Sequence, residues 1–198
     1  MNPKHGINHH GITLLRAADP RVRRIRRSLP KASAHGNKIW RSSLAIMDYF
    51  IDNPLSASSR VLDIGCGWGA VAVHLAKQFE ADVTALDIDP RVELLVKLHS
   101  DINNCRVNFS ARDLASLDSR EINSYHTIVG ADICFWDAIV EPLFNFISRS
   151  NGPKAPAVLI ADPGRPPFWE LAERCVEAFD AEVISRNSYI PVSYTHLT

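Results

Sequence analysis

The chain has 198 residues, of which 46% are apolar and 22% are charged, and this composition of a globular protein excludes a mainly disordered chain. No apolar run approaches the ~20 residues of a membrane-spanning helix, so we exclude an integral membrane protein and expect no membrane partner. The net charge of zero is unevenly distributed: residues 1–41 carry ten Lys and Arg and one acid, and the remainder carries twelve Lys and Arg and twenty-one acids.

The basic N-terminal segment predicts one helix. Asp19 can cap this helix, and Pro20 suits its first position. Val22, Ile25 and Leu29 then share one face, while the arginines between positions 21 and 27 take the other faces. We therefore predict that residues 1–38 form a basic extension with one amphipathic helix, which lies on a larger domain with its charges outward.

Helical and strand-like periodicity alternates from residue 39 onward. Helices are predicted over residues 41–52, 70–78, 90–100, 138–149 and 168–179, and strands over residues 60–64, 82–86, 107–110, 127–131, 157–161 and 182–185. Strands that alternate with helices are typical of a parallel sheet. The predicted fold class for residues 39–191 is therefore α/β: a Rossmann-like, doubly wound, mostly parallel sheet with helices on both faces.

Residues that follow the predicted strands are the candidates for a binding site, because ligands of doubly wound sheets bind at the carboxyl ends of the strands. Gly65, Gly67 and Gly69 follow the first strand of this region, and such glycines let the backbone turn tightly and approach a ligand. The spacing of Gly65, Gly67 and Ala70, with Asp87 22 residues beyond Gly65, also satisfies the dinucleotide-binding pattern G-x-G-x-x-G/A. Spacing alone leaves a nicotinamide dinucleotide and another nucleotide-like cofactor open.

Two features favour S-adenosylmethionine over a dinucleotide. Asp63 places a carboxylate before the glycine loop, where it would attract the ammonium and sulfonium of S-adenosylmethionine and repel a pyrophosphate. The second feature is size, because a dehydrogenase would need a further substrate domain and the residues beyond the predicted sheet are too few to build one. Asp87 can then accept hydrogen bonds from both ribose hydroxyls, and Asp113 is placed for the adenine amino group, with a plain surface acid as its alternative.

Several segments resemble known families. VLDIGCGWGA at residues 61–70, with LDIDP at residues 86–90, resembles the class I S-adenosylmethionine-dependent methyltransferases. WRSS at residues 40–43, FIDNP at 50–54 and LIADPGRPPF at 159–168 are similar to the seven-β-strand protein-lysine methyltransferases, and within them to the enzymes that modify the electron-transfer flavoprotein β subunit. The resemblance implies S-adenosyl-L-methionine as the cofactor and a protein substrate such as that subunit.

The resemblance also assigns candidate site residues. A D-x-x-[YF] pattern that shapes the lysine channel corresponds to Asp132 and Phe135, which are the predicted catalytic residues, and Trp136 departs from the family pattern. Packing at the end of a strand is the alternative for the two aromatic residues. The predicted cofactor-binding residues are Asp63, Gly65, Gly67, Asp87, Asp113 and, from the WRSS segment, Trp40.

For Asp162 and Arg165, in the LIADPGRPPF segment, the sequence leaves two roles open. The resemblance favours a part in shaping the substrate pocket, and the alternative is an ion pair within one turn.

The end of the chain predicts an incomplete sheet. Methyltransferases of the class it resembles end with an antiparallel hairpin, of which residues 182–190 can supply only the first arm. Residues 192–198 read like a translated sequencing adapter, so we expect the natural sequence to stop near Pro191. We therefore predict that the sheet lacks its last antiparallel strand and that the strand at 157–161 has an unpaired edge, which favours association.

Other functions remain open at this point. Methyl transfer to a small molecule or to RNA would keep the cofactor, and the basic residues 21–27 would then contact phosphates. Nucleic acid is the less favoured partner. A non-catalytic nucleotide-binding module is the third possibility.

The cysteines and histidines carry weaker signals. The four cysteines lie 29 to 41 residues apart without a C-x-x-C pair, which is typical of thiols in a reducing compartment. We predict the cytoplasm, with the mitochondrial matrix as the alternative suggested by the acid-poor N-terminus. His9 and His10 are adjacent, and no cysteine or aspartate near them in the sequence completes a ligand set, so no metal site is predicted.

Overall fold

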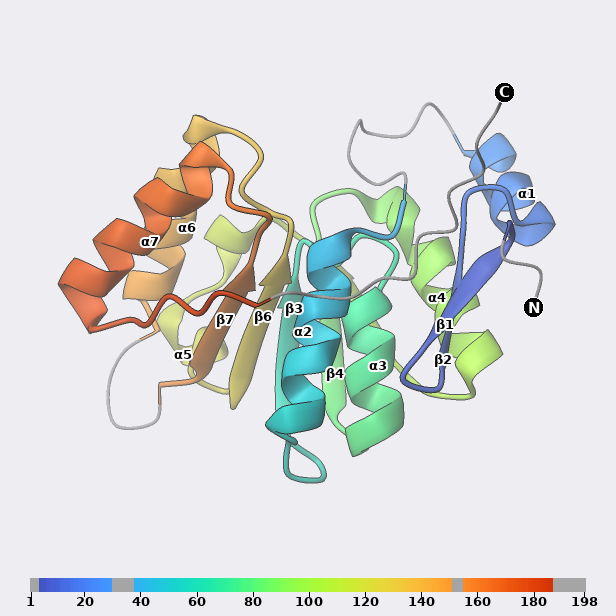
Figure 1. The fold of residues 1–198 in the computed structure, drawn as a ribbon, viewed down its shortest axis with the longest axis horizontal. Coiled ribbons are helices and arrows are strands. Elements are labelled where there is room, and N and C mark those ends of the chain that lie inside the picture. Colours follow the sequence, from blue (N-terminus) through green and yellow to red (C-terminus); the bar gives the residue numbers. More distant parts are fainter. Residues whose placement is uncertain (1–3, 30–37, 151–154, 187–198) are drawn as a thin grey trace.

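The computed structural model describes residues 4–29, 38–150 and 155–186 (Figure 1). Its strands are β1 (Gly6–His9), β2 (Ile12–Leu15), β3 (Arg60–Ile64), β4 (Asp82–Asp87), β5 (Asn108–Ala111), β6 (Thr127–Ala131) and β7 (Ala157–Ala161). Its helices are α1 (Pro20–Ser28), α2 (Arg41–Asp52), α3 (Ala70–Phe79), α4 (Glu93–Asn103), α5 (Ser119–Ile122), α6 (Val140–Ser148) and α7 (Pro166–Phe179). Short 3-10 turns span Pro90–Val92, Leu114–Ser116 and Asp137–Ile139.

The central sheet has five parallel strands in the order β5-β4-β3-β6-β7. The chain runs outward from β3 to β4 and β5 and then returns to the other side of β3 with β6, so the strand order reverses between β3 and β6. Ile64 at the end of β3 lies opposite both Leu86 of β4 and Gly130 of β6. The residues after these three strands therefore gather at one edge of the sheet, where doubly wound folds bind ligands.

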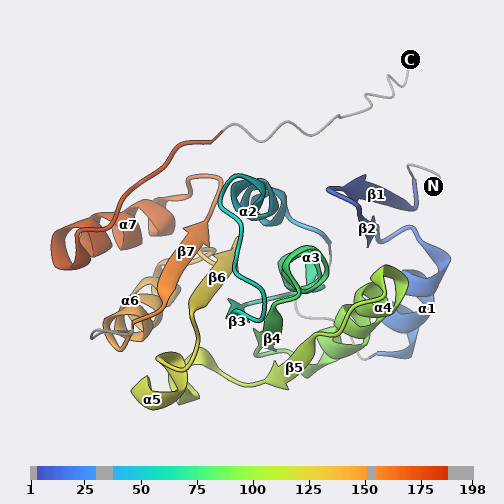
Figure 2. The ribbon, with the colours of Figure 1, turned by 90° about the horizontal axis from the view of Figure 1, so that it is seen from below.

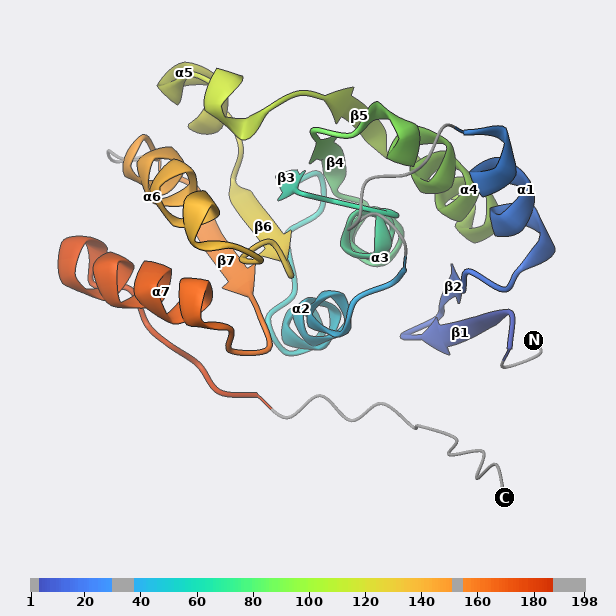
Figure 3. The same cartoon turned by 90° about the horizontal axis from the view of Figure 1, so that it is seen from above.

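Two hydrophobic cores cover the two faces of the sheet. Because side chains alternate along a strand, Val61 of β3 packs toward α2, α3 and α4, whereas Leu62 and Ile64 pack toward α5, α6 and α7. Figure 3 shows these two groups of helices on opposite sides of the strands. The predicted α/β fold with helices on both faces is confirmed.

A hairpin of β1 and β2 precedes α1, and the sequence analysis missed it. Its apolar residues Ile12 and Leu14 pack against α2 and α3, and Figure 2 shows it at the end of the molecule away from α7. Asn103 of α4 holds the hairpin, since its amide oxygen accepts from Thr13 N–H at 2.8 Å and its amide nitrogen donates to Thr13 O at 2.9 Å. The two strands are short, and β2 (ITLL) has no strict alternation of apolar and polar residues that would identify it in the sequence.

The helix predicted in the basic segment is confirmed as α1. The Asp19 side chain accepts from Arg21 N–H at 2.9 Å and thereby caps the helix. Val22 is fully buried beside Trp68 and Leu95, while Arg23, Arg24, Arg26 and Arg27 are exposed.

The strand predicted at residues 182–185 is wrong. α7 ends at Phe179, the following Asp180 has a φ of 55°, and residues 181–186 have no regular structure. The segment is anchored by side chains rather than by ladder hydrogen bonds, and Arg186 Nη2 lies 2.6 Å from Asp52 Oδ2 of α2. Among the described residues β7 pairs only with β6, so its outer edge is unpaired as predicted. Residues 192–198 lie outside the described part of the chain.

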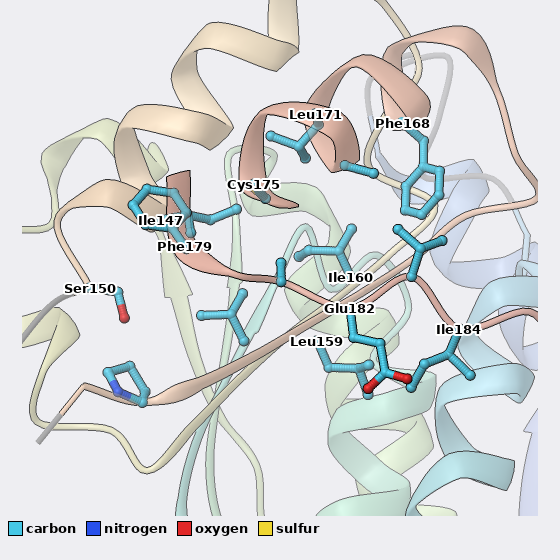
Figure 4. Close-up of a pocket in the computed structure, with 15 residues that line it drawn as sticks. Ile147, Ser150, Leu159, Ile160, Phe168, Leu171, Cys175, Phe179, Glu182 and Ile184 are labelled. Carbon is cyan, nitrogen blue, oxygen red and sulfur yellow. The ribbon is translucent and has the colours of Figure 1, made fainter. Parts of the chain in front are cut away.

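An apolar cavity of about 370 Å³ lies along this outer edge (Figure 4). Leu159 and Ile160 of β7 line it together with Leu171 of α7, and the segment after α7 contributes Glu182 and Ile184. None of the predicted site residues lines this cavity.

Across the described residues, the structure contains no helix with both the length and the apolar character of a membrane span.

Candidate active site

A second cavity, of about 400 Å³, opens at the carboxyl ends of the strands. This volume lies within the range of small-molecule sites. The loops after β3, β4, β5 and β6 and the start of α2 line it. The cavity brings together all eight residues that the sequence singled out: Asp63, Gly65, Gly67, Asp87, Asp113, Trp40, Asp132 and Phe135.

The glycine loop forms the floor of the cavity by adopting backbone conformations that other residues avoid. Gly65 has a φ of 63°, and a Cβ atom there would lie 2.6 Å from Ile133 Cγ2. Gly67 has a φ of 53°, and a Cβ atom there would enter open space. The loop therefore leaves room for a ligand to approach its backbone.

Asp87, at the end of β4, is held by two backbone groups. Gly67 N–H donates to Asp87 Oδ2 at 3.0 Å, and Asp89 N–H donates to Asp87 Oδ1 at 2.9 Å. Burial raises the pKa of Asp87, and these two hydrogen bonds act against the rise. Each carboxylate oxygen has a further lone pair, so Asp87 can accept two more hydrogen bonds from a ligand diol.

Asp63 lies deeper in the site. Its side chain faces α3, and Asp63 Oδ2 accepts from Ala72 N–H at 3.1 Å. Burial raises its pKa to about 7, with the negative charge of Asp87 acting in the same direction and the Ala72 hydrogen bond against it. A cationic ligand group in the cavity would favour the ionised carboxylate, and a phosphate would be repelled by it.

The rim of the cavity carries exposed apolar side chains beside an exposed acid. Ile88 is 71% exposed and Trp136 is 57% exposed, and both line the opening. Asp113 is exposed, and its Oδ1 accepts from Ala115 N–H at 2.8 Å. Exposed apolar residues at the mouth of a cavity are typical of a surface that a ligand covers.

Asp132 connects three segments at one wall of the site. It is 5% exposed and has a left-handed backbone with a φ of 56°. Its Oδ2 accepts from Ser42 N–H at 3.0 Å, near the N-terminus of α2. Trp40 precedes this helix without capping it, so Asp132 supplies the acceptor that the helix end requires. Asp132 Oδ1 accepts from Arg165 Nη2.

Phe135 lies in an aromatic wall next to this ion pair. Its ring centroid is 5.0 Å from that of Trp40, at an edge-on angle of 67°, and 5.8 Å from that of Trp136. The guanidinium carbon of Arg165 lies 3.9 Å from the Phe135 centroid, within the range of a cation–π interaction. The ammonium of Lys38 lies 4.0 Å from the Trp40 centroid, so the wall combines three aromatic rings with two cations.

Sequence reasoning found only part of this wall. The ion pair that it offered within one turn is present, since Arg165 Nη2 lies 2.9 Å from Asp162 Oδ2. It missed the second partner of Arg165, which is Asp132, and it missed the Ser42 backbone. The available signal was that the WRSS and LIADPGRPPF segments carried the same resemblance although they are far apart in the sequence.

The comparisons with known proteins agree with this geometry. Residues 61–151 match the model of a family described as a methyltransferase domain. The matched segment contains the glycine loop and the cavity residues from Asp63 to Phe135. YjhP from E. coli, a solved structure with 18% sequence identity and a TM-score of 0.50, covers 71% of this chain with 55% of its own and shares the fold.

The chain is also similar to curated methyltransferases of vertebrates. It is 35% identical over 132 residues to the electron transfer flavoprotein beta subunit lysine methyltransferase of Xenopus laevis, and 30% identical over 130 residues to that of Danio rerio. Both alignments cover 65% of this chain, and they cover 52% and 50% of those proteins. The chain thus spans about half the length of the curated relatives that it matches.

The residues of the cavity fit S-adenosylmethionine. The fixed carboxylate of Asp87 suits a ribose diol, the open space at Gly67 allows close approach of a ligand to the backbone, and the buried carboxylate of Asp63 suits a cation. This cofactor, when bound, supplies an electrophilic methyl group.

Proposed function

We propose that this chain belongs to an enzyme that transfers methyl groups from S-adenosylmethionine to lysine side chains of a protein. The observation that carries the proposal is the wall of Trp40, Phe135 and Arg165 beside the glycine-loop cavity. The names of the relatives from Xenopus laevis and Danio rerio support a lysine acceptor. The electron-transfer flavoprotein β subunit is the first candidate substrate on the same ground.

The main chemical obstacle is the charge of the acceptor. A free lysine has a pKa near 10.4, so presenting the neutral amine at pH 7 costs about 4–5 kcal/mol. An apolar surface removes water from the ammonium and lowers its pKa. Phe135 and Trp136 would supply that surface at the mouth of the cavity. The remaining task is positioning, because displacement at a methyl carbon needs an in-line approach to about 3 Å.

We assign the remaining residues by their contacts. Asp87 would bind the ribose, Asp113 the adenine amino group, and Gly65 and Gly67 would admit the cofactor to the loop. Asp63 would face its cationic part. These assignments rest on the positions of the five residues around the cavity.

Asp132 acts in this proposal as a positioning residue. Its two oxygens already accept from Ser42 and Arg165, so its charge holds α2 and the start of α7 at the mouth of the cavity, where the lysine would enter. Trp40 and Phe135 owe their relative position to these contacts. The carboxylate thereby shapes the entrance for the lysine.

The decisive experiment follows a labelled methyl group. Three separate incubations each contain the full chain and methyl-labelled S-adenosylmethionine. The first adds purified electron-transfer flavoprotein β subunit, the second adds RNA, and the third adds a small-molecule fraction. We expect label on a lysine of the protein, located by mass spectrometry and lost when that lysine is replaced by arginine. The Asp87→Ala variant is the control for cofactor dependence. Label in RNA or in a small molecule would overturn the lysine assignment, and cofactor binding without any label would indicate the non-catalytic module.

A further inference from the structure

A cluster of metal-ligating side chains lies outside the cofactor cavity. It consists of His9 and His10 from the first hairpin and Asp48 from α2, and none of them lines the cavity. Figure 3 shows the end of β1, where His9 lies, directed toward α2. The sequence offered no acid beside the two histidines, and the fold brings one to them from 38 residues away.

The hairpin turn places both imidazoles on the same side. His9 pairs with Ile12, so His10 and Gly11 form a two-residue connection. Both have left-handed backbones, with φ values of 46° and 73°, which is typical of the turn that such hairpins favour. Successive side chains of an extended strand point to opposite faces, and the left-handed turn at His10 removes that alternation.

The three ligand atoms converge closely. Nε2 of His9 and Nε2 of His10 each lie 2.7 Å from Asp48 Oδ1, and the two ring centroids are 4.3 Å apart. The side chain of His9 is 19% exposed, that of His10 is 33% exposed and that of Asp48 is 29% exposed, so a dissolved ion can reach them. Gln78 Nε2 donates to His10 O at 2.6 Å and fixes the turn from α3.

A third imidazole lies next to this cluster without hydrogen bonds. His74 of α3 is fully buried, and neither of its ring nitrogens has a hydrogen-bond partner. Its ring centroid is 6.0 Å from that of His10. Burial, with a further contribution from the two neighbouring histidines, lowers the pKa of His74 to about 4, so this imidazole is neutral at pH 7.

We propose that His9, His10 and Asp48 form a binding site for one divalent transition-metal ion of the zinc type. Two imidazole nitrogens and one carboxylate oxygen are ligands that suit Zn²⁺ better than Mg²⁺ or Ca²⁺. Ligand atoms of a tetrahedral zinc ion are about 3.4 Å apart, so the nitrogen–oxygen distances need to open by only about 0.7 Å. A water molecule would complete the coordination.

Such an ion would have a structural effect. It would link the hairpin to α2, the helix that begins directly after Trp40. The same three side chains can also form a hydrogen-bonded cluster without an ion, in which both imidazoles donate from Nε2 to Asp48. Metal titration separates these two states.

The test uses the full chain without a purification tag, because a histidine tag would itself bind zinc. After treatment with a chelator, the protein is titrated with Zn²⁺ by calorimetry and with Co²⁺ by visible absorption. We expect one equivalent of each ion, absorption bands of four-coordinate Co²⁺, and a rise of Tm with Zn²⁺. Asp48→Asn and His9→Gln should each weaken binding by at least about 100-fold, because losing a ligand should cost no less than losing a residue that only supports one.

Asp52→Asn is the matched control, because this residue lies one turn later on the same helix and pairs with Arg186. Its metal affinity should equal that of the unchanged chain. Failure of the unchanged chain to bind Zn²⁺, or equal binding by the Asp48→Asn variant, would overturn the proposal. A loss of Tm in Asp48→Asn without metal binding by the unchanged chain would identify the hydrogen-bonded cluster instead. None of these measurements depends on methyltransferase activity.

Discussion

The guanidinium of Arg165, directly before α7, forms an ion pair with the carboxylate of Asp132, directly after β6. The side chain of Asp132 is 4% exposed, and that of Arg165 is 21% exposed. Because the same carboxylate accepts from Ser42 N–H, one side chain holds three segments of the chain at the mouth of the cavity.

Removing this cation should destabilise the fold. We expect Arg165→Met to lower the free energy of unfolding by about 3 kcal/mol, because it leaves the buried Asp132 and Asp162 without their cation. The double variant with Arg165→Met and Asp132→Asn should lose less free energy of unfolding than the two single variants lose in sum. Urea denaturation measures these losses. Arg174→Met, which breaks an ion pair with the exposed Glu141, should cost far less, because solvent screens an exposed pair. Equal effects of the two arginine changes would contradict this account.

Asp87 should carry a large part of the cofactor affinity. We expect Asp87→Ala to weaken the binding of S-adenosylmethionine or S-adenosylhomocysteine by about 2–3 kcal/mol, because two hydrogen bonds to a charged acceptor are lost. Calorimetry measures this change directly. Asp82→Ala, at the opposite end of the same strand, should leave the affinity unchanged. An unaltered affinity in Asp87→Ala would remove Asp87 from the site.

Phe135 should affect turnover more than cofactor affinity. Phe135→Ala removes the ring between Trp40 and Arg165, and the proposed function places this ring against the acceptor rather than the nucleoside. We expect kcat/KM for the protein substrate to fall by more than the cofactor affinity does, whereas Phe135→Tyr should retain most of the activity. If cofactor binding collapses while the circular dichroism spectrum is unchanged, Phe135 belongs to the cofactor pocket.

Asp63 should make the stability of the cofactor-free chain depend on pH. Its pKa is raised to about 7 in the folded chain from an ordinary value of 3.8, so between these values the folded chain retains a proton that the unfolded chain has released. The free energy of unfolding should therefore fall as pH rises through this window, by up to about 1.4 kcal/mol per pH unit. Asp63→Asn keeps an acceptor for Ala72 N–H and should lack this contribution. Parallel pH profiles of the two proteins would show that Asp63 is not the group responsible.

The arginines of α1 should act on the acceptor and not on the cofactor. We expect simultaneous replacement of Arg23, Arg24, Arg26 and Arg27 by glutamine to leave cofactor affinity unchanged, to raise KM for the protein substrate several-fold and to reduce its salt dependence, as for a peripheral charged patch. The paired variant Arg106→Gln and Arg120→Gln changes exposed charges elsewhere and should have no such effect. Unchanged kinetics in the α1 variant would make these arginines a solvated face.

The sequence by itself determined the sheet, most of the helices and the composition of the cavity. Strand periodicity and the glycine loop are local properties, and the parallel order places the residues after each strand at a common edge. For this reason Asp63, Asp87, Asp113 and Asp132 could be selected from the chain before their distances were known, and all four line the cavity.

Only the tertiary structure decided which partners these residues have. Ser42 and Asp132 are 90 residues apart, Asp132 and Arg165 are 33 apart, and His9 and Asp48 are 39 apart, so no local pattern relates them. The hairpin of β1 and β2 is likewise held by contacts with α4, and the segment after α7 is held by Arg186 and Asp52 rather than by strand pairing. Each of these features depends on contacts that form only when distant segments pack together, and propensity along the chain contains no information about them.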